Sequence, residues 1–195
     1  ITGAPSGFSA IAGVGGCPVT TKTKKLTAAC PNPPYTFGNP GGAYSLALSP
    51  GKWDVAGFYE LAPFGGQFLS AIAPVTITGG TITTVNFTVP YAAPASVTST
   101  ITVTNVPSGV SIEEDLLLAC PTIAPYTGGT IPIECVGGSA SPGQPASIKT
   151  LPPGKWLLYP GYLTVTSETV GTTPTEVKLT AGQSVTKNLT INYSG

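Results

Sequence analysis

Apolar and polar residues alternate along much of the chain, and Pro or Gly interrupts almost every window of about a dozen residues. The alternation is clearest from Tyr44 to Leu48 and from Lys52 to Tyr59, and again from Ile148 to Leu151 and from Lys155 to Tyr162. A period of two residues predicts strands with one buried face, whereas the helical period is nearly absent. Short strands separated by turn signals predict an all-β protein built from antiparallel sandwiches of the Greek-key type.

One short turn occurs twice, as Ser-Pro-Gly-Lys-Trp at residues 49–53 and as Pro-Pro-Gly-Lys-Trp at residues 152–156. The two tryptophans are 103 residues apart (156 − 53), and the patterns around both turns resemble one another at nearly this spacing. A unit of about a hundred residues is large enough to bury a core of its own. We therefore expect two tandem sandwiches, residues 1–93 and 94–195.

Late in each half, a Gly-containing turn separates two further alternating segments. These segments are Val75–Thr78 and Thr81–Val89 in the first half, and Val177–Thr180 and Gln183–Ile191 in the second. Because a short Gly turn between alternating segments is typical of β-hairpins, a hairpin is predicted at both places.

The second half begins with an alternating strand, Val97–Thr104, of which only the last two residues have counterparts in the first half, Ile1 and Thr2. The first sandwich is therefore expected to lack most of its N-terminal strand. An unpaired row of backbone groups beside an apolar groove is unfavourable unless something fills it. Three explanations stay open: the chain is trimmed from a longer protein, the first sandwich manages with fewer strands, or a strand of a neighbouring molecule completes it. Ile1 and Thr2 are thus candidate assembly contacts.

The chain has four cysteines, and they fall two in each half: Cys17, Cys30, Cys120 and Cys135. Of the three pairings that four cysteines allow, only Cys17–Cys30 with Cys120–Cys135 keeps each bridge inside one half. Zinc is the weaker alternative, because the chain has no His and no C-x-x-C. We expect two disulfides and therefore an oxidising location, secreted or at the cell surface.

Charged residues make up 8% of the chain, and its eight Lys and eight acids give a net charge of zero without any Arg. This balance argues against nucleic-acid binding, which depends on a basic surface. No apolar run approaches the ~18 residues of a membrane span. A surface without net charge does not repel its own copies, which favours self-association. A chain that opens with Ile1 rather than Met is interpreted as processed or trimmed.

Catalytic groups are scarce. Without His, the Ser/His/Asp and Cys/His arrangements are excluded, so we expect no enzyme activity and no cofactor or metal. The one acid cluster, Glu113–Asp115, is interpreted as a solvated charge patch rather than a cation site, which needs more oxygen ligands. Trp53 and Trp156 could stack on sugars, but their repetition beside a turn favours a place in the core.

Two other features concern the surface. The apolar loop that contains Phe64 and Phe68 is either an assembly contact or a segment whose rings fold back onto the core. Three N-x-S/T sequons, at Asn86, Asn188 and Asn192, are candidate glycosylation sites in a secreted protein.

The residues that follow both turns carry a resemblance to a family. Leu151–Trp156, Gly161–Tyr162 and Val177–Ser184, with a similar skeleton from Leu48 onward, resemble the transthyretin-like or carboxypeptidase-regulatory-like sandwich and related B-type repeats of bacterial surface proteins. The resemblance covers the C-terminal half of each repeat better than the N-terminal half. It implies a non-catalytic accessory, adhesive or structural module of extracellular proteins.

Together these features predict an extracellular structural protein, a self-associating subunit of a cell-surface filament, pilus-like fibre or surface layer. Donor-strand addition to the first sandwich would assemble it. The alternative is an adhesin stalk or a carbohydrate-binding accessory module of a larger secreted protein, with glycans as partners.

Overall fold

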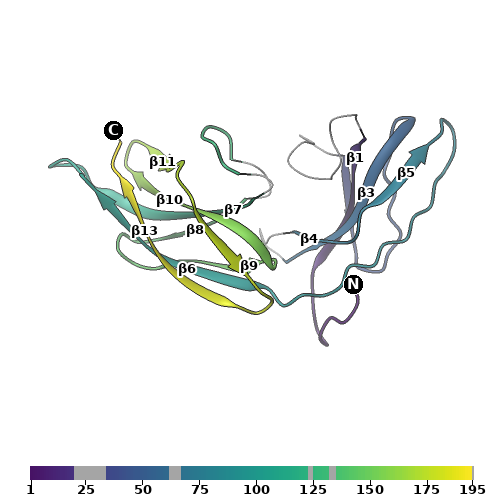
Figure 1. Cartoon of the computed structure of the whole chain (residues 1–195), viewed down its shortest axis with the longest axis horizontal. Helices are drawn as coiled ribbons and strands as arrows, with labels where there is room; N and C mark the ends of the chain where they lie inside the picture. Colours follow the sequence, from purple (N-terminus) through teal and green to yellow (C-terminus); the bar gives the residue numbers. More distant parts are fainter. Residues whose placement is uncertain (20–33, 62–66, 123–124, 132–134, 195) are drawn as a thin grey trace. The chain divides into compact units, whose positions relative to one another are not determined.

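The computed structural model describes residues 1–19, 34–61, 67–122, 125–131 and 135–194. The chain divides into two compact units, which we call unit 1 (Ile1–Ala92) and unit 2 (Ala93–Gly195) (Figure 1). Every regular element in the described residues is a β-strand, which confirms the all-β prediction. No helix in these ranges is long and apolar enough to cross a membrane.

Unit 1 contains one antiparallel sheet in the order β2-β1-β3-β4, and β5 pairs with the first part of β3. Its strands are β1 (Ile11–Pro18), β2 (Tyr35–Gly38), β3 (Gly51–Glu60), β4 (Gln67–Leu69) and β5 (Ala73–Ile77).

Unit 2 contains two sheets, in the orders β11-β10-β7-β8 and β13-β6-β9, and β12 pairs with β10. Its strands are β6 (Ala95–Thr104), β7 (Ile112–Pro121), β8 (Val136–Ala140), β9 (Ala146–Leu151), β10 (Gly154–Thr164), β11 (Glu168–Val170), β12 (Thr175–Leu179) and β13 (Ser184–Asn192). Side chains from both sheets, such as Ile101 of β6 and Leu158 of β10, share one core.

The repeated Pro-Gly-Lys-Trp turn begins the central strand of both units. Gly51 and Gly154 have φ angles of 146° and 154°, which only glycine adopts readily. The chain then turns so that Trp53 and Trp156 enter the interior, where they are 8% and 5% exposed. Each indole N–H donates to the carbonyl four residues earlier at 2.9 Å. The turn therefore sets the start of a core strand, as the sequence favoured.

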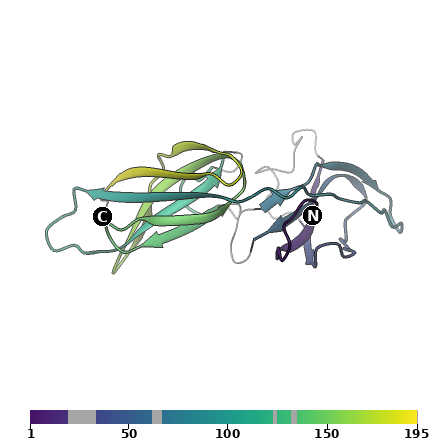
Figure 2. The same ribbon diagram turned by 90° about the horizontal axis from the view of Figure 1, so that it is seen from below.

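The predicted hairpins are wrong. In unit 2, β12 pairs with β10 whereas β13 pairs with β6, so the Gly turn at residues 180–183 connects two sheets. The β6–β13 pairing is also parallel, within a fold that is otherwise antiparallel in its described ladders (Figure 2). In unit 1, β5 pairs with β3, and residues 81–89 form no strand. Alternation alone identifies a strand but not its partner, which is why the local pattern was misleading.

Candidate functional site

The strand β6 lies at the centre of the second sheet of unit 2. It pairs in parallel with β13 through nine residues and in antiparallel with β9. Its inward side chains Val97, Ser99 and Ile101 are 0%, 0% and 3% exposed. β6 therefore supplies backbone hydrogen bonds to both neighbours and apolar side chains to the core between the two sheets.

In the described residues of unit 1, Thr2 is the counterpart of the end of this strand. Thr2 forms an isolated parallel bridge with Pro90. Both residues stand 102 positions before a paired couple of unit 2, Thr104 and Asn192 (104 − 2 and 192 − 90). The same hydrogen bond occurs in both units. The N–H of Tyr91 donates to the Thr2 carbonyl at 2.8 Å, and the N–H of Tyr193 donates to the Thr104 carbonyl at 2.8 Å.

The two segments that would flank such a strand run through unit 1 without ladder partners among the described residues. In residues 44–48, Tyr44, Leu46 and Leu48 are half-buried and the intervening side chains are exposed. Residues 85–89 likewise alternate, with Val85 and Phe87 turned inward, whereas residues 81–84 are exposed. Both segments are nevertheless drawn as coil (Figure 1). The strand that the sequence predicted at Tyr44–Leu48 is thus absent, because a strand needs a neighbour to bond with.

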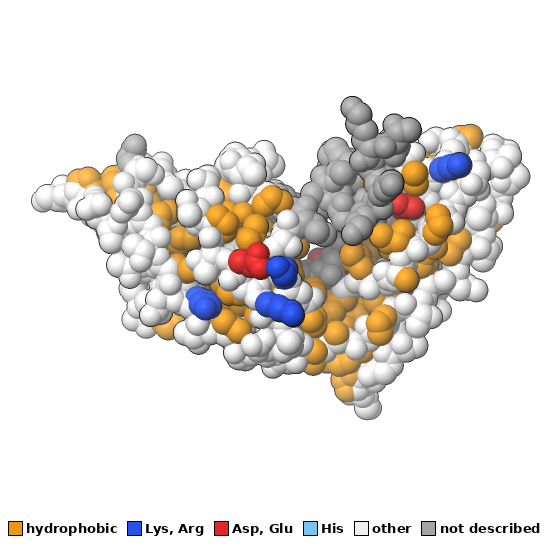
Figure 3. Space-filling model, in the orientation of Figure 1, with side chains coloured by type: hydrophobic (Ala, Val, Ile, Leu, Met, Phe, Trp, Pro, Cys, Tyr) orange, Lys and Arg blue, Asp and Glu red, His pale blue; other side chains and the backbone are white. Residues whose placement is uncertain are grey.

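A groove of about 640 Å³ lies between these two segments. Its floor includes Val55 and Phe58 of β3 and Val75 of β5, and Ile1 lies among its lining residues. No Lys, Asp or Glu occurs among the described residues that line it. Charged side chains are also sparse on the face of the molecule shown in Figure 3. The groove therefore suits an uncharged, apolar occupant.

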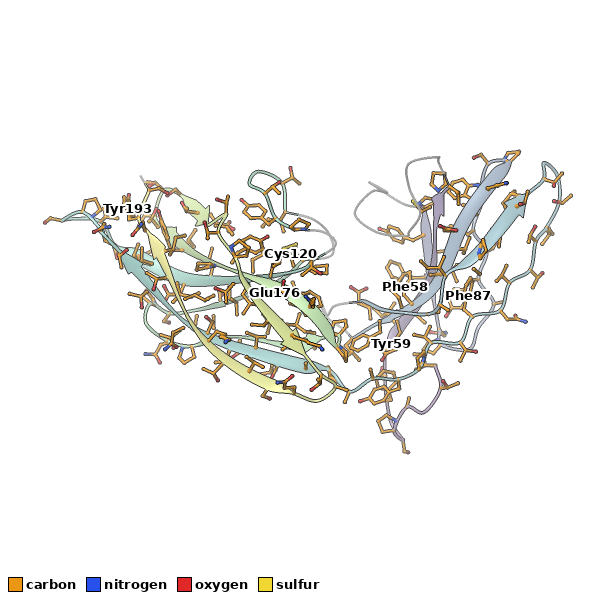
Figure 4. All side chains as sticks on the ribbon, viewed as in Figure 1. Phe58, Tyr59, Phe87, Cys120, Glu176 and Tyr193 are labelled. Atoms are coloured by element: carbon orange, nitrogen blue, oxygen red, sulfur yellow. A yellow bond between two sulfur atoms is a disulfide. The ribbon has the colours of Figure 1, made fainter. Side chains whose placement is uncertain are left out.

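Phe87 is held against the floor of this groove, beside β3 (Figure 4). A Cβ atom on Gly57 would come within 2.7 Å of the Phe87 Cβ, so the missing side chain of Gly57 lets the 81–89 segment approach the sheet. Residues 81–89 are thus positioned by packing on β3, with their outer backbone edge unpaired in the described structure.

Ile1 and Val89 pack together at the end of the groove, in a small core that also includes Tyr59 and Phe68. The hydroxyl of Tyr59 accepts a hydrogen bond from the Ala92 N–H at 3.0 Å. Tyr162 does the same in unit 2, where its hydroxyl accepts from the Ser194 N–H at 2.8 Å. These tyrosine clasps, which sequence reasoning missed, tie down the end of the last segment of each unit.

Cys17 and Cys120 are buried, at 3% and 0% exposed. Cys120 and Cys135 form a disulfide, with their Cα atoms 4.2 Å apart. Cys17 is also disulfide-bonded. Cys30 lies outside the described residues, so the predicted Cys17–Cys30 pairing stays a prediction.

Several residues that the sequence offered as candidate surface contacts are buried in the structure. Trp53 and Trp156 are buried and hydrogen-bonded, so they are not platforms for sugars. Phe68 is 5% exposed and stacks on Tyr59 with 4.6 Å between ring centroids, so this ring folds back onto the core and is not a contact surface. Phe64 lies outside the described residues.

Asp115 corrects the interpretation of the acid cluster as a solvated patch. Glu113 and Glu114 are exposed, but Asp115 is 2% exposed, and its carboxylate accepts a hydrogen bond from the Gly143 N–H at 2.7 Å. Burial raises the pKa of the Asp115 carboxyl, and this hydrogen bond lowers it by a smaller amount. In the described part of the chain, no three His, Cys, Asp or Glu side chains gather as metal ligands would.

The three sequon asparagines are exposed. Asn188 lies within β13, at the edge of its sheet. The side-chain oxygen of Asn192 accepts hydrogen bonds from the Thr104 hydroxyl and the Asn105 side-chain amide. Asn86 belongs to the segment that borders the groove.

An exposed aromatic pair lies on β2, at the edge of the sheet of unit 1. Tyr35 and Phe37 are 52% and 48% exposed, and their ring centroids are 5.2 Å apart. Phe37 also contacts Phe58 at 5.5 Å. Pro- and Gly-rich surroundings such as those of this Tyr-Thr-Phe segment are more typical of a loop than of a strand.

Comparison with known proteins finds no family model and no curated protein that matches the chain. The transthyretin-like resemblance therefore remains an interpretation of the sequence.

Among solved structures, a streptococcal ancillary pilin is similar with a TM-score of 0.35 and 10% identity, over 92% of this chain and 57% of that one. A putative cell adhesion protein of Bacteroides fragilis has a TM-score of 0.29 and 13% identity, over 95% and 81% of the two chains. The major pilin subunit of Bacillus cereus has a TM-score of 0.31 and 15% identity, over 80% and 41%. This chain thus spans about half the length of two of these proteins.

Proposed function

We propose that the chain is a structural subunit of an extracellular filament, pilus-like fibre or surface layer, in which a strand from a neighbouring copy completes unit 1. The observation that carries this proposal is the uncharged groove of about 640 Å³ between residues 44–48 and 81–89. Both walls present alternating apolar side chains and backbone edges without ladder partners in the described structure.

The free energy of strand addition has two sources. An inserted strand pairs with backbone groups on both sides, and a buried backbone group without a partner costs about 1–3 kcal/mol. The inserted side chains also cover Val85, Phe87 and Leu46, at roughly 25 cal/mol for each Å² of apolar surface removed from water. Strand addition to an open sheet is an established mode of association between proteins.

Charge and covalent structure agree with this role. The chain has zero net charge, so its copies approach without long-range repulsion. The Cys120–Cys135 disulfide is stable in an oxidising compartment, which supports a secreted or cell-surface location. The chain has no His to act as an acid or base, and both tryptophan side chains are buried.

Electron microscopy and light scattering on the purified chain test the proposal, with Val85→Lys as the blocking variant. Val85 is half-buried and lines the groove, so a lysine there places an unpaired charge where the donor strand would lie. Thr88→Lys is the matched control, because Thr88 is exposed on the same segment and does not line the groove. We expect filaments or oligomers from the wild type and from Thr88→Lys, and monomers from Val85→Lys. A wild type that stays monomeric at all concentrations, or a Val85→Lys variant that assembles normally, would contradict the proposal.

A second candidate, carbohydrate binding, no longer rests on the tryptophans. The exposed Tyr35–Phe37 pair is the feature that favours it, since exposed apolar patches mark interaction sites. A glycan array probed with the wild type and with Tyr35→Ala tests it. Glycan binding by the wild type that is lost in the variant supports a glycan-binding module. If the wild type binds no glycan on the array, this second candidate function is contradicted.

A further inference from the structure

We propose that the strand filling the groove runs parallel to residues 82–89 and antiparallel to residues 44–48, with an aliphatic side chain opposite Phe87. This inference rests on the proposed function, because it takes a second copy of the chain as the donor. It adds the direction of the donor strand, its register and the chemistry of its side chains.

The direction follows from the Thr2–Pro90 bridge. This bridge is parallel, and its residues lie 102 positions before Thr104 and Asn192, the last pair of the parallel β6–β13 ladder. The segment after Pro90 also repeats the hydrogen bond of unit 2, from the N–H of Tyr91 to the Thr2 carbonyl at 2.8 Å. Since this end of the groove has the geometry of the β6–β13 ladder, a strand that continues the ladder is parallel to residues 82–89.

The register follows from the same spacing. In unit 2, Leu189 faces Ile101, and Leu189 stands 102 positions after Phe87 (189 − 87). The donor residue opposite Phe87 therefore has the place of Ile101, which is 3% exposed in the core of unit 2. A side chain at that place lies between the two sheet faces, so a large aliphatic residue suits it and a charged one does not.

A second copy is the occupant that charge favours. The described lining residues include no Lys, Asp or Glu, so a charged side chain of the donor has no oppositely charged side chain to pair with in the groove. The strand β6, which fills the equivalent place in unit 2, has Thr and Ser at its outward places and no charged residue. Two copies of a chain with zero net charge also meet without repulsion.

A synthetic peptide of residues 95–102, Ala-Ser-Val-Thr-Ser-Thr-Ile-Thr, is the probe for direction and register. It is added to the full chain before assembly, with a nitroxide label at its N-terminus. In the parallel arrangement the label broadens the amide signals of Thr83 and leaves that of Val89 sharp. Amide hydrogen exchange should slow in residues 83–88 and 45–48 together, since the peptide bonds with both walls.

A matched pair of peptides tests the side-chain chemistry. Lys in place of Ile101 should weaken binding at least about a hundredfold, because it buries a charge without a partner. Lys in place of Thr100, which points outward, should change the affinity less than about threefold. Broadening at Val89 instead of Thr83, equal effects of the two lysines, or no binding by the unaltered peptide would each overturn the inference.

The donor itself is identified in assembled material. A photoreactive residue at Thr83 should cross-link to a second copy of the chain, and a cross-link to another protein or within one molecule would overturn that assignment. The two proposals fail separately. If the chain assembles but the peptide binds antiparallel, the inferred direction of the donor strand is wrong and the proposed function stands. If the peptide binds parallel but the chain never assembles, the proposed function is wrong and the inferred geometry of the groove stands.

Discussion

Tyr162 fastens the end of β13 to the central strand of unit 2. Its hydroxyl accepts a hydrogen bond from the Ser194 N–H at 2.8 Å and donates one to the Ser194 carbonyl at 3.0 Å. The ring also stacks on Tyr193, with 5.5 Å between centroids. Because β13 is an edge strand, this clasp limits fraying at the C-terminal end of the unit.

Tyr162→Phe keeps the ring and removes both hydrogen bonds. We expect unit 2 to lose about 1–2 kcal/mol of its free energy of unfolding, the contribution of one or two partly buried hydrogen bonds. Urea unfolding followed by the fluorescence of Trp156, in a Trp53→Phe background, measures the change. Tyr193→Phe is the control, since it removes the hydroxyl of a neighbouring tyrosine that is partly exposed. Equal losses in the two variants would show that the clasp does not stabilise the unit.

Asp115 makes the stability of unit 2 depend on pH. Burial raises the pKa of its carboxyl in the folded protein, with a smaller opposing effect from the Gly143 N–H. The folded unit therefore binds this proton more tightly than the unfolded chain. The resulting stabilisation is complete below the pKa of the unfolded chain and is lost as the pH rises through the folded pKa.

We expect Asp115→Asn to abolish this dependence, because the amide oxygen still accepts from Gly143 but carries no titrating proton. Between about pH 7 and pH 4 the wild type should gain stability relative to the variant as the pH falls. Thermal unfolding at a series of pH values measures it. Glu113→Gln, on the exposed side of the same strand, should leave the dependence unchanged. An Asp115→Asn curve parallel to that of the wild type would contradict the assignment.

The strand β2 depends on a close approach at Gly13 of β1. A Cβ atom there would come within 2.5 Å of Phe58 Cζ and 2.6 Å of the Thr36 carbonyl oxygen, which is backbone and cannot turn aside. Gly15 lies two residues further along the same strand, and its nearest contact would be 3.8 Å away. The two glycines thus share a strand and a face but differ in the space that they leave.

Gly13→Ala should therefore destabilise unit 1 by about 1–3 kcal/mol, the usual cost of overpacking, and speed amide exchange in β2. Gly15→Ala should be tolerated within about 0.5 kcal/mol. Trp53 fluorescence in a Trp156→Phe background reports the unfolding of unit 1. If the two alanine variants are equally stable, β2 does not depend on the close approach.

The Cys120–Cys135 disulfide closes a loop of 15 residues between β7 and β8. In the chain-entropy model a loop of this length contributes about 3 kcal/mol, by restricting the unfolded chain. We expect a Cys120→Ala, Cys135→Ala double variant to lose roughly this much stability in unit 2, measured by urea unfolding. Because Cys17 is also disulfide-bonded, the double variant is a cleaner test than a reducing agent. An unchanged unfolding midpoint would show that the strand ladders alone set the stability.

For the whole molecule, assembly through an uncharged groove should respond little to salt. No Lys, Asp or Glu lines the groove in the described structure, and the chain has zero net charge. We expect the critical concentration for assembly to change less than about threefold between 0.05 and 0.5 M NaCl, since screening acts on charges. Light scattering across this range checks it. A fall in assembly of tenfold or more at high salt would indicate an electrostatic interface instead.

Much of the architecture follows from the sequence by itself. The alternation of Val, Ile, Thr and Tyr with polar residues, broken by Pro and Gly, determines an all-β chain because strand preference and turn chemistry act locally. The spacing of Trp53 and Trp156 also predicted, to within one residue, the register in which the Thr2–Pro90 bridge corresponds to the Thr104–Asn192 pair.

Only the tertiary structure decided which segments pair and which side chains are buried. The parallel β6–β13 ladder joins residues nearly ninety apart, and no local pattern encodes such a choice. The burial of Asp115 and the Tyr162 clasp likewise depend on loops that approach from elsewhere in the chain. Residues 44–48 and 81–89 have the alternation of strands but no ladder, because a strand is completed by its neighbour and the described part of unit 1 holds only the last pair.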